Sequence, residues 1–432
     1  MSDLASQTTA FVRTQMLPEK EPPLTERGAV KWVRENLFSG WLNSVLTVVS
    51  LYLIIALLNH ILPWVFNGVW VADSLSQCRE ILDGETGACW AVITERWKQL
   101  LFGFYPSELY WRPILAFILL FVAMAPVLYD QLPRKMLWVT AIYPFGMVWL
   151  VWGGSIWGPV SIMAGFAVGV FALRFFSVYS SLGAVIAAFV APILWWLFLA
   201  GPAADLLQSV IPIGIETAQS KQIGGFMISV IIGLSGIALS LPIGIVLALG
   251  RQSDLFIVKT LCVGFIEFIR GVPLITLLFT ASLLLNYFLP PGTNFDIVLR
   301  VIIMVTLFSA AYMAETIRGG LAALPKGQYE AADSLGLDYW KAQQLIIMPQ
   351  ALKISIPGIV GNFIGLFKDT TLVMFIGIFD MLGLASAIRA DLDWNGVYSE
   401  LFIFVALVFW ICCFSMSRYS QWLERKLQTE HR

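Results

Sequence analysis

Long runs of apolar residues recur along the chain, and shorter polar segments separate them. A helix needs roughly 20 apolar residues to cross the hydrocarbon core of a bilayer, and many of these runs approach that length. In the first half of the chain the pattern predicts five spans, near residues 43–66, 113–129, 137–153, 158–173 and 183–199. The predicted fold class is an all-α polytopic membrane protein, because a helix satisfies its own backbone hydrogen bonds in lipid.

A second and more regular series of apolar runs extends from about residue 224 to residue 418. The segment 254–290 is too long for one straight span. It predicts a helix at the inner interface over 255–268, a turn at 271–273 and a span that ends near residue 289. The other spans of this region are predicted at 224–249, 298–321, 354–378 and 397–417. We therefore expect a core of five membrane segments here.

These two series of spans divide the chain into four regions. The opening residues are polar and lack the short apolar core and cleavage site of a secretory signal, so we expect a cytoplasmic tail. This tail covers residues 1–40, and about five additional membrane segments follow at 41–200, with a long periplasmic loop at 67–111. The core is predicted at 221–418, with a polar cytoplasmic loop at 323–349. A cytoplasmic C-terminal tail is predicted at 419–432.

The stretch 138–200 is the least regular part of the pattern. Its glycines at positions 153, 154, 165 and 169 either mark close helix contacts or re-entrant turns, or belong to plain lipid-facing helices. The number of crossings therefore stays open in this stretch. An odd number of crossings before residue 200 keeps the orientation of the later spans consistent.

Composition and charge also indicate a membrane location. The chain is 58% hydrophobic and 13% charged, with a mean hydropathy of +0.79, whereas soluble proteins carry about 25% charged residues. The net charge of −1 does not indicate a nucleic-acid partner. Basic residues gather before residue 35, at 130–135 and after residue 417, whereas the loops 67–110 and 380–395 are acidic. This asymmetry predicts that both termini are cytoplasmic.

One polar segment, residues 330–349, interrupts the apolar series and is long enough for two short helices. Gly336 lies where the first helix would need a left-handed residue to end, and Asp338 can cap the second. Tyr339 and Trp340 would give the second helix an apolar contact face, and Pro349 marks the return to the membrane. The residue types alone leave two readings open, a docking surface for a partner or an amphipathic loop on lipid headgroups.

The spacing within this segment resembles the signature loop of permease subunits in type I bacterial ABC importers. Glu-Ala-Ala at 330–332 is followed after three residues by Gly336 and after nine more by Ile346 and Pro349, with Met348 in place of the usual Leu. The resemblance implies that the loop docks into the cleft of an ATP-hydrolysing subunit. The residues expected to couple the two subunits are Glu330, Ala331, Ala332, Gly336, Asp338, Tyr339, Trp340, Ile346 and Pro349.

Two further motifs narrow the resemblance to the polar amino acid uptake branch of this family (histidine, glutamate, glutamine, arginine and opine transporters). They are Arg270-Gly271-Val272-Pro273-Leu274 and Lys368-Asp369-Thr370-Thr371-Leu372. The additional N-terminal region is similar to M-type permeases of general L-amino acid or glutamate/glutamine/aspartate/asparagine transporters. The resemblance implies a multi-pass protein of the bacterial inner membrane that imports polar L-amino acids by alternating access, together with a second permease, two ATP-binding subunits and a periplasmic amino-acid-binding protein.

Several charged residues fall within or beside the predicted spans. Glu315 and Arg318 are three residues apart, as are Glu267 and Arg270, so each pair can form on one helix face and both are interpreted as structural ion pairs. The fourth core span also contains charge, which is costly in lipid unless it is buried in protein or faces water. Its candidate substrate-pathway residues are Asn362, Lys368, Asp369, Thr370 and Thr371. The alternative is a helix break that packs against the partner subunit.

No catalytic or metal centre is predicted. The chain lacks the glycine-rich phosphate loop of ATP-binding proteins, so we expect no enzyme activity and no cofactor in this chain, with ATP and Mg²⁺ in the partner subunits. His60 and His431 are too far apart in sequence to suggest a metal site. Cys78 and Cys89 share the predicted periplasmic loop, where an oxidising compartment would let them join; two free thiols are the alternative.

Two rival functions fit a polytopic membrane protein. A secondary transporter driven by an ion gradient predicts coupling residues near the middle of the membrane and inverted repeats. Lys368 and Asp369 fit the first requirement weakly, and no repeat is visible in the sequence. A non-transporting scaffold would leave the polar loop unexplained.

Overall fold

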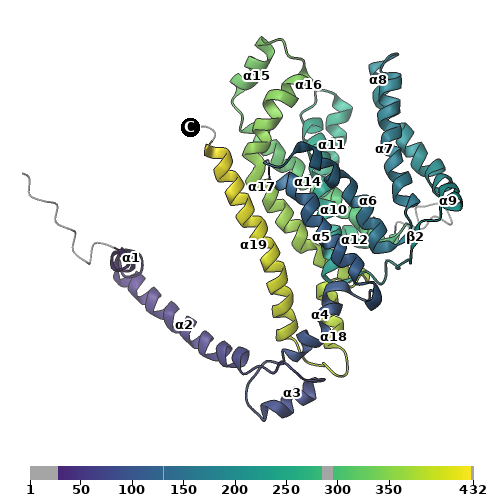
Figure 1. Ribbon diagram of the computed structural model, residues 1–432. Coiled ribbons are helices and arrows are strands. Elements are labelled where there is room, and N and C mark those ends of the chain that lie inside the picture. Colours follow the sequence, from purple (N-terminus) through teal and green to yellow (C-terminus); the bar gives the residue numbers. More distant parts are fainter. Residues whose placement is uncertain (1–27, 130, 285–294, 430–432) are drawn as a thin grey trace, which may run out of the picture. The chain divides into compact units, whose positions relative to one another are not determined.

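The computed structural model describes residues 28–129, 131–284 and 295–429 (Figure 1). Arg13, Lys20 and Arg27 of the predicted basic tail lie outside the described residues, as does the end of the span predicted to reach residue 289. The described chain forms two compact units, one of residues 28–69 and 82–88 and the other of residues 70–81 and 89–429.

The first unit contains two helices, α1 (Gly28–Asn36) and α2 (Trp41–Phe66). None of the 26 residues of α2 is buried, and apolar side chains are exposed around the whole helix. Such a helix is suited to lipid rather than to water. Its end is joined to the segment 82–88 by 2.8 Å hydrogen bonds from the N–H of Val69 to the carbonyl of Ala88 and from the N–H of Ala88 to the carbonyl of Trp64.

Nine helices of the described residues are long and apolar enough to cross a membrane, or ten if one bent pair counts as a span. They match the series predicted from the apolar runs, and the all-α fold class is confirmed. In the second unit the additional spans are α5 (Trp111–Leu128), α6 (Leu137–Trp152), α7 (Trp157–Phe176) and a continuous span made of α8 (Ser181–Leu194), a π-helical segment (Trp195–Leu199) and α9 (Ala200–Val210).

Glycines allow α7 to pack closely against the α8–α9 span. A Cβ at Gly165 would overlap the ring of Trp196, and one at Gly169 would overlap Pro192. The indole N–H of Trp196 donates to the carbonyl of Ile162 (2.9 Å). Close helix contact is therefore the alternative that the structure supports for these two glycines.

Two-residue strands β1 (Gly154–Ser155) and β2 (Gly214–Ile215) pair antiparallel, and they are too short for any apolar pattern to predict.

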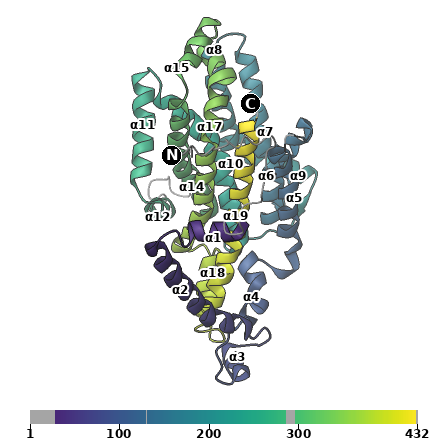
Figure 2. The same ribbon diagram turned by 90° about the vertical axis from the view of Figure 1, so that its left-hand side faces the viewer.

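The core of the second unit is built on α10 (Gly225–Arg251) and α14 (Ile297–Ala322), which pack along each other. Ile228 and Ile232 of α10 and Val301 and Val305 of α14 are buried between them. Helix α17 (Met348–Asp369) packs against α14 and continues as a 3-10 segment (Thr370–Ile376), and α19 (Ser399–Thr429) packs against α17 (Figures 1 and 2).

The bent pair consists of α11 (Phe256–Gly271) and α12 (Leu274–Phe279), which a π-helical segment (Thr280–Leu284) extends. The two helices meet at 104°. The bend lies at the predicted turn, because the residue before a proline avoids the helical conformation. Val272, which precedes Pro273, is extended, with φ −107° and ψ 132°.

Two short helices that the sequence did not predict, α4 (Ala91–Phe102) and α18 (Met381–Arg389), lie at the end of this unit opposite α15 (Lys326–Ser334) and α16 (Tyr339–Ala342) (Figure 1). Neither has an apolar run of spanning length. Arg96 of α4 pairs with Asp391 (3.0 Å), and the N–H of Cys89 donates to the buried Glu400 (2.8 Å). Cys89 is joined by a disulfide to Cys78 of α3 (Leu75–Leu82), so the structure contains the bonded alternative.

Candidate functional site

The polar segment forms helix α15, a left-handed turn and helix α16. Gly336, which follows α15, has a φ of +67°. Its N–H donates to the carbonyl of Asp333 (2.9 Å), and the N–H of Leu337 donates to the carbonyl of Ala332 (3.3 Å). This pair of bonds ends a helix at a left-handed residue. Glycine adopts that conformation without the steric conflict that a Cβ introduces, so Gly336 stands where the sequence placed it.

Asp338 caps α16. One of its carboxylate oxygens accepts a hydrogen bond from the N–H of Lys341 (3.0 Å), and the other pairs with Nζ of Lys341 (3.0 Å). The backbone bond, followed by the side-chain contact, lowers the pKa of Asp338 below its usual value because both favour the charged form. The cap therefore stays ionised at neutral pH and fixes where the second helix begins.

The apolar side chains of the turn face outward. Tyr339 and Trp340 are 51% and 69% exposed, and their rings meet edge to face with centroids 5.3 Å apart. Leu335, between the two helices, is 72% exposed. Neighbouring exposed apolar side chains of this kind indicate a contact with another protein or with a membrane surface. We call these three residues the apolar corner.

Not every residue of the predicted coupling set is open to a partner. Ala331 is exposed, but Ala332 is buried and Ile346 is half-buried against the core. Adjacent residues of a helix point about 100° apart, so the two alanines do not share one open face. Ala332 lies on the packed side of α15. The side-chain amide of Gln350 donates to that of Gln328 (2.9 Å) and ties α17 to α15.

The second helix does not end at Pro349. Helix α16 continues through a π-helical segment (Gln343–Ile347) directly into α17. A proline clashes with the carbonyl four residues before it in a regular helix. Here the preceding turn is widened, with the N–H of Met348 bonded five residues back to Gln343, and Pro349 fits without a break. The apolar corner is thus joined to α17 by continuous helix.

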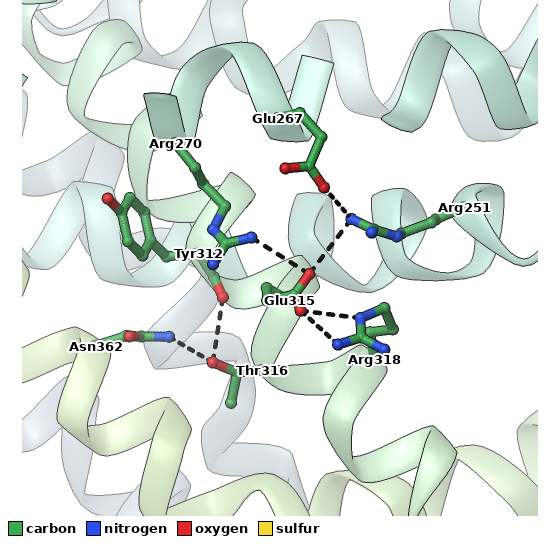
Figure 3. Close-up of polar contacts among 8 residues, drawn as sticks. All are labelled: Arg251, Glu267, Arg270, Tyr312, Glu315, Thr316, Arg318 and Asn362. Carbon is green, nitrogen blue, oxygen red and sulfur yellow. Dashed lines mark hydrogen bonds and ion pairs between the residues drawn. The ribbon is translucent and has the colours of Figure 1, made fainter. Parts of the chain in front are cut away.

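Five charged side chains from three helices meet in one ionic cluster where α10 ends (Figure 3). Glu315 bonds to Arg318 (2.5 Å), Arg251 (3.3 Å) and Arg270 (3.5 Å), and Arg251 also bonds to Glu267 (2.9 Å). The predicted Glu315–Arg318 pair is present. Glu267, however, pairs with Arg251 rather than with Arg270. Helix α11 packs against both α10 and α14, and spacing along one helix cannot reveal partners on another.

A cavity of about 240 Å³ lies between α14 and α17. Asn362 and Asp369, two of the predicted pathway residues, line it together with Ser309 and Tyr312. Asn362 and Asp369 are about two helical turns apart and therefore share a face of α17. Drug-sized ligands occupy pockets of about 300–1,000 Å³, so this cavity suits a smaller molecule. The described residues bring together no group of three or more metal-ligating side chains.

Lys368, Thr370 and Thr371 lie outside the lining of this cavity, so of the predicted pathway residues only Asn362 and Asp369 meet there. Lys368 is exposed on another side of α17. Thr370 is fully buried, and its hydroxyl donates to the carbonyl of Phe367 (2.7 Å), while that of Thr371 donates to the carbonyl of Lys368 (2.9 Å). Consecutive residues of a helix face different directions, so a contiguous polar motif cannot line one cavity throughout.

Ser309 and Tyr312 were not predicted, because isolated small or aromatic residues are ordinary in apolar helices. The side chain of Ser309 is buried, and its hydroxyl has no hydrogen-bond partner among the described residues. A buried hydroxyl without a partner is costly, and this one lies on the cavity wall, where it can donate to or accept from a bound molecule. The ring of Tyr312 lies 5.6 Å from the guanidinium of Arg270 (Figure 3), so the cavity adjoins the ionic cluster.

Comparison with known proteins relates the whole chain to amino-acid permeases. Residues 240–429 match the family described as binding-protein-dependent transport system inner membrane component. The chain is 59% identical over 433 residues to the glutamate/glutamine/aspartate/asparagine transport system permease protein BztC of Rhodobacter capsulatus, which covers 98% of this chain and 99% of that protein. It is 41% identical over 405 residues to the inner membrane amino-acid ABC transporter permease protein YhdY of Escherichia coli, over 93% and 94% of the two chains. A crystal structure of an amino acid ABC transporter with histidines matches 47% of this chain and 92% of that chain, with 29% identity and a TM-score of 0.42.

Proposed function

Since the chain belongs to the family of amino-acid ABC transporter permeases, we propose that it forms half of the membrane pathway of an ATP-driven importer of glutamate, glutamine, aspartate and asparagine. The relative from Rhodobacter capsulatus bears these four amino acids in its name and aligns over nearly the whole chain, the additional N-terminal spans included. A second, related permease forms the other half. Two ATP-binding subunits and a periplasmic amino-acid-binding protein complete the assembly.

The observation that carries this proposal is the apolar corner between α15 and α16. Tyr339 and Trp340 are exposed on a helix that runs without a break into α17, and the bond between Gln328 and Gln350 ties α15 to the same helix. An ATP-binding subunit that holds this corner would move α17 as a lever and, with it, one wall of the cavity. The residues in direct contact with that subunit are Glu330, Ala331, Leu335, Gly336, Asp338, Tyr339 and Trp340, whereas Ala332, Ile346 and Pro349 shape the turn.

The cavity offers contacts for both charged ends of an amino acid. Asp369 provides a carboxylate for the substrate ammonium group, and the free hydroxyl of Ser309 can donate to the substrate carboxylate. The three guanidinium groups and two carboxylates of the ionic cluster leave an excess of positive charge beside Tyr312. Such an excess favours anionic substrates such as glutamate and aspartate.

The proposed orientation places α15, α16 and both termini in the cytoplasm, and α4 and α18 in the periplasm. It follows from the basic residues that flank the spans. This chain is then the pore subunit, and ATP and Mg²⁺ bind to the partner subunits. In the proposed cycle, ATP binding closes the two ATP-binding subunits together and opens the cavity to the periplasm. ATP hydrolysis then closes the periplasmic side and opens the cavity to the cytoplasm.

Uptake of radiolabelled L-glutamate into vesicles that contain the full complex tests this function. We expect uptake to require ATP on the side that faces α15 and α16 and to survive an uncoupler. The binding protein must be present on the other side. Uptake that ignores ATP and collapses with the ion gradient would instead establish the secondary transporter.

A further inference from the structure

A second cavity, of about 260 Å³, lies between the additional helices α5 and α6 and the core helices α10 and α19. Its wall is almost entirely apolar and includes Ala116 of α5, Met147 of α6, Val230 of α10 and Val408 of α19. Tyr143 also lines it, but its hydroxyl already donates to the carbonyl of Ala116 (2.9 Å). An apolar cavity of about 150 Å³ is enough to hold a benzene ring in another protein.

We propose that this cavity binds an acyl chain of a phospholipid. All four helices around it are long and apolar enough to span a membrane, so the medium at its mouth is hydrocarbon. Ile114 and Ile118, which line the cavity from α5, are 46% and 54% exposed and form part of that mouth. An empty cavity would forfeit the dispersion contacts that a chain supplies. Water is a poor substitute, because the wall offers too few free polar groups to bind it.

The end of α4 shows where the headgroup lies. Leu101 and Phe102 line the cavity at that end, and Lys98, one helical turn earlier, is exposed. Trp97 and Trp111, on either side of the connection between α4 and α5, are 42% and 52% exposed. Tryptophan is enriched at the level of lipid headgroups. The lipid therefore belongs to the leaflet at the α4 end, with its phosphate near the Lys98 ammonium group, and its headgroup is anionic.

The bound chain would fill the seam between the additional helices and the permease core. Ala116 and Met147 belong to the former, and Val230 and Val408 to the latter. The lipid thus contributes to holding α5 and α6 on α10 and α19. This role is independent of the cavity between α14 and α17 and of the ionic cluster, so the transport function and the lipid site can stand or fall separately.

Native mass spectrometry of the intact transporter tests the site after reconstitution with phosphatidylglycerol and phosphatidylcholine and removal of loose lipid by detergent. We expect one retained phospholipid per copy of this chain, with phosphatidylglycerol preferred. Ala116→Phe places a ring in the cavity and is expected to lower retention about tenfold, the equivalent of about 1.4 kcal/mol. Val122→Phe, at a position of α5 that is 43% exposed and outside the cavity lining, is the matched control and should retain the lipid.

Lys98→Gln should remove the preference for phosphatidylglycerol while leaving phosphatidylcholine retention unchanged. If Ala116→Phe is not recovered as a folded complex, Val408→Phe fills the same cavity from α19 and replaces it in the comparison. The proposal is overturned if the wild-type complex keeps only detergent, if the filling and control variants retain lipid equally, or if a photoreactive group at Met147 labels a helix of another subunit instead of lipid.

Discussion

Among single residues, Gly336 decides the geometry of the apolar corner. A Cβ at this position would meet no neighbouring atom within 4 Å, so only the positive φ opposes substitution. A left-handed residue costs about 1–2 kcal/mol when it is not glycine, and a β-branched side chain is the least tolerant. We expect Gly336→Val to lower ATP-driven uptake about tenfold without loss of membrane insertion. Gly336→Asn should retain most of the uptake because Asn tolerates this conformation; equal losses would show that the backbone conformation is not what matters.

Asp369 tests whether the cavity between α14 and α17 lies on the substrate pathway. A hydrogen bond to a charged group contributes about 1.5–3 kcal/mol, so Asp369→Asn should raise the substrate concentration needed for half-maximal uptake about tenfold or more. Lys368→Gln, next to it but outside the cavity lining, is the control and should change uptake little. An unaltered uptake profile in Asp369→Asn would assign this carboxylate to helix packing.

Asp380 makes stability depend on pH at the α18 end. Its carboxylate is buried and accepts hydrogen bonds from the N–H groups of Leu382 (3.2 Å) and Gly383 (2.9 Å). Burial raises its pKa to about 6. Because the folded pKa exceeds the unfolded value of about 3.9, this group stabilises the fold fully below pH 4, and its contribution is lost as the pH rises through 6.

Thermal melts of the detergent-solubilised protein can follow this loss through the fluorescence of its tryptophans. Relative to Asp380→Asn, the wild type should lose stability between pH 4 and pH 7, by the equivalent of about 3 kcal/mol at most. Asn can cap α18 in the same way, so the variant should fold. A difference between the two proteins that stays constant across this range would mean that the carboxyl titrates normally.

Among elements, long spans were predictable and short helices were not. An apolar run of spanning length admits few structures in lipid, so each span from α5 to α19 overlaps the run that predicted it. The α8–α9 span extends past its predicted end to Val210, and the α16–α17 span begins earlier than predicted, at Tyr339. Helices α4 and α18 have only 12 and 9 residues and no such run. The helix through Pro349 and the pairing of Glu267 with Arg251 also escaped prediction. The first depends on the junction between α16 and α17, and the second on the packing of α11 against α10. Residue spacing along a single helix does not reveal either of these relations between helices.

The ionic cluster joins three of these helices, and its central residue is Glu315. Removing its charge by Glu315→Gln would leave Arg251, Arg270 and Arg318 with mutual repulsion. Because the Glu315 side chain is 24% exposed, we expect a loss of about 1–3 kcal/mol, between the values for surface and buried pairs. The apparent melting temperature of the solubilised protein measures it. Glu35→Gln, which breaks the exposed Lys31–Glu35 pair, should have no measurable effect; equal shifts would remove the structural role of the cluster.

In the whole molecule, the parts that would bind ATP-binding subunits and substrate are joined by one helix. The apolar corner leads through continuous helix into α17, and α17 carries Asn362 and Asp369 on the wall of the cavity. The opposite wall belongs to α14, which also carries Glu315 of the ionic cluster. A movement of the corner would therefore change the spacing between α14 and α17. The family resemblance predicted the corner, but the connection to the cavity emerges only from the fold.

Crosslinking from the apolar corner tests the coupling directly. In the reconstituted complex of identified subunits, a photoreactive amino acid replaces Trp340 or, as the control, Leu392, which is 93% exposed in the connection that follows α18. We expect the probe at 340 to label an ATP-binding subunit with a yield that changes when ATP is added, and the probe at 392 not to label it. Labelling of lipid alone from position 340, or access to that position from the periplasmic side, would contradict the account.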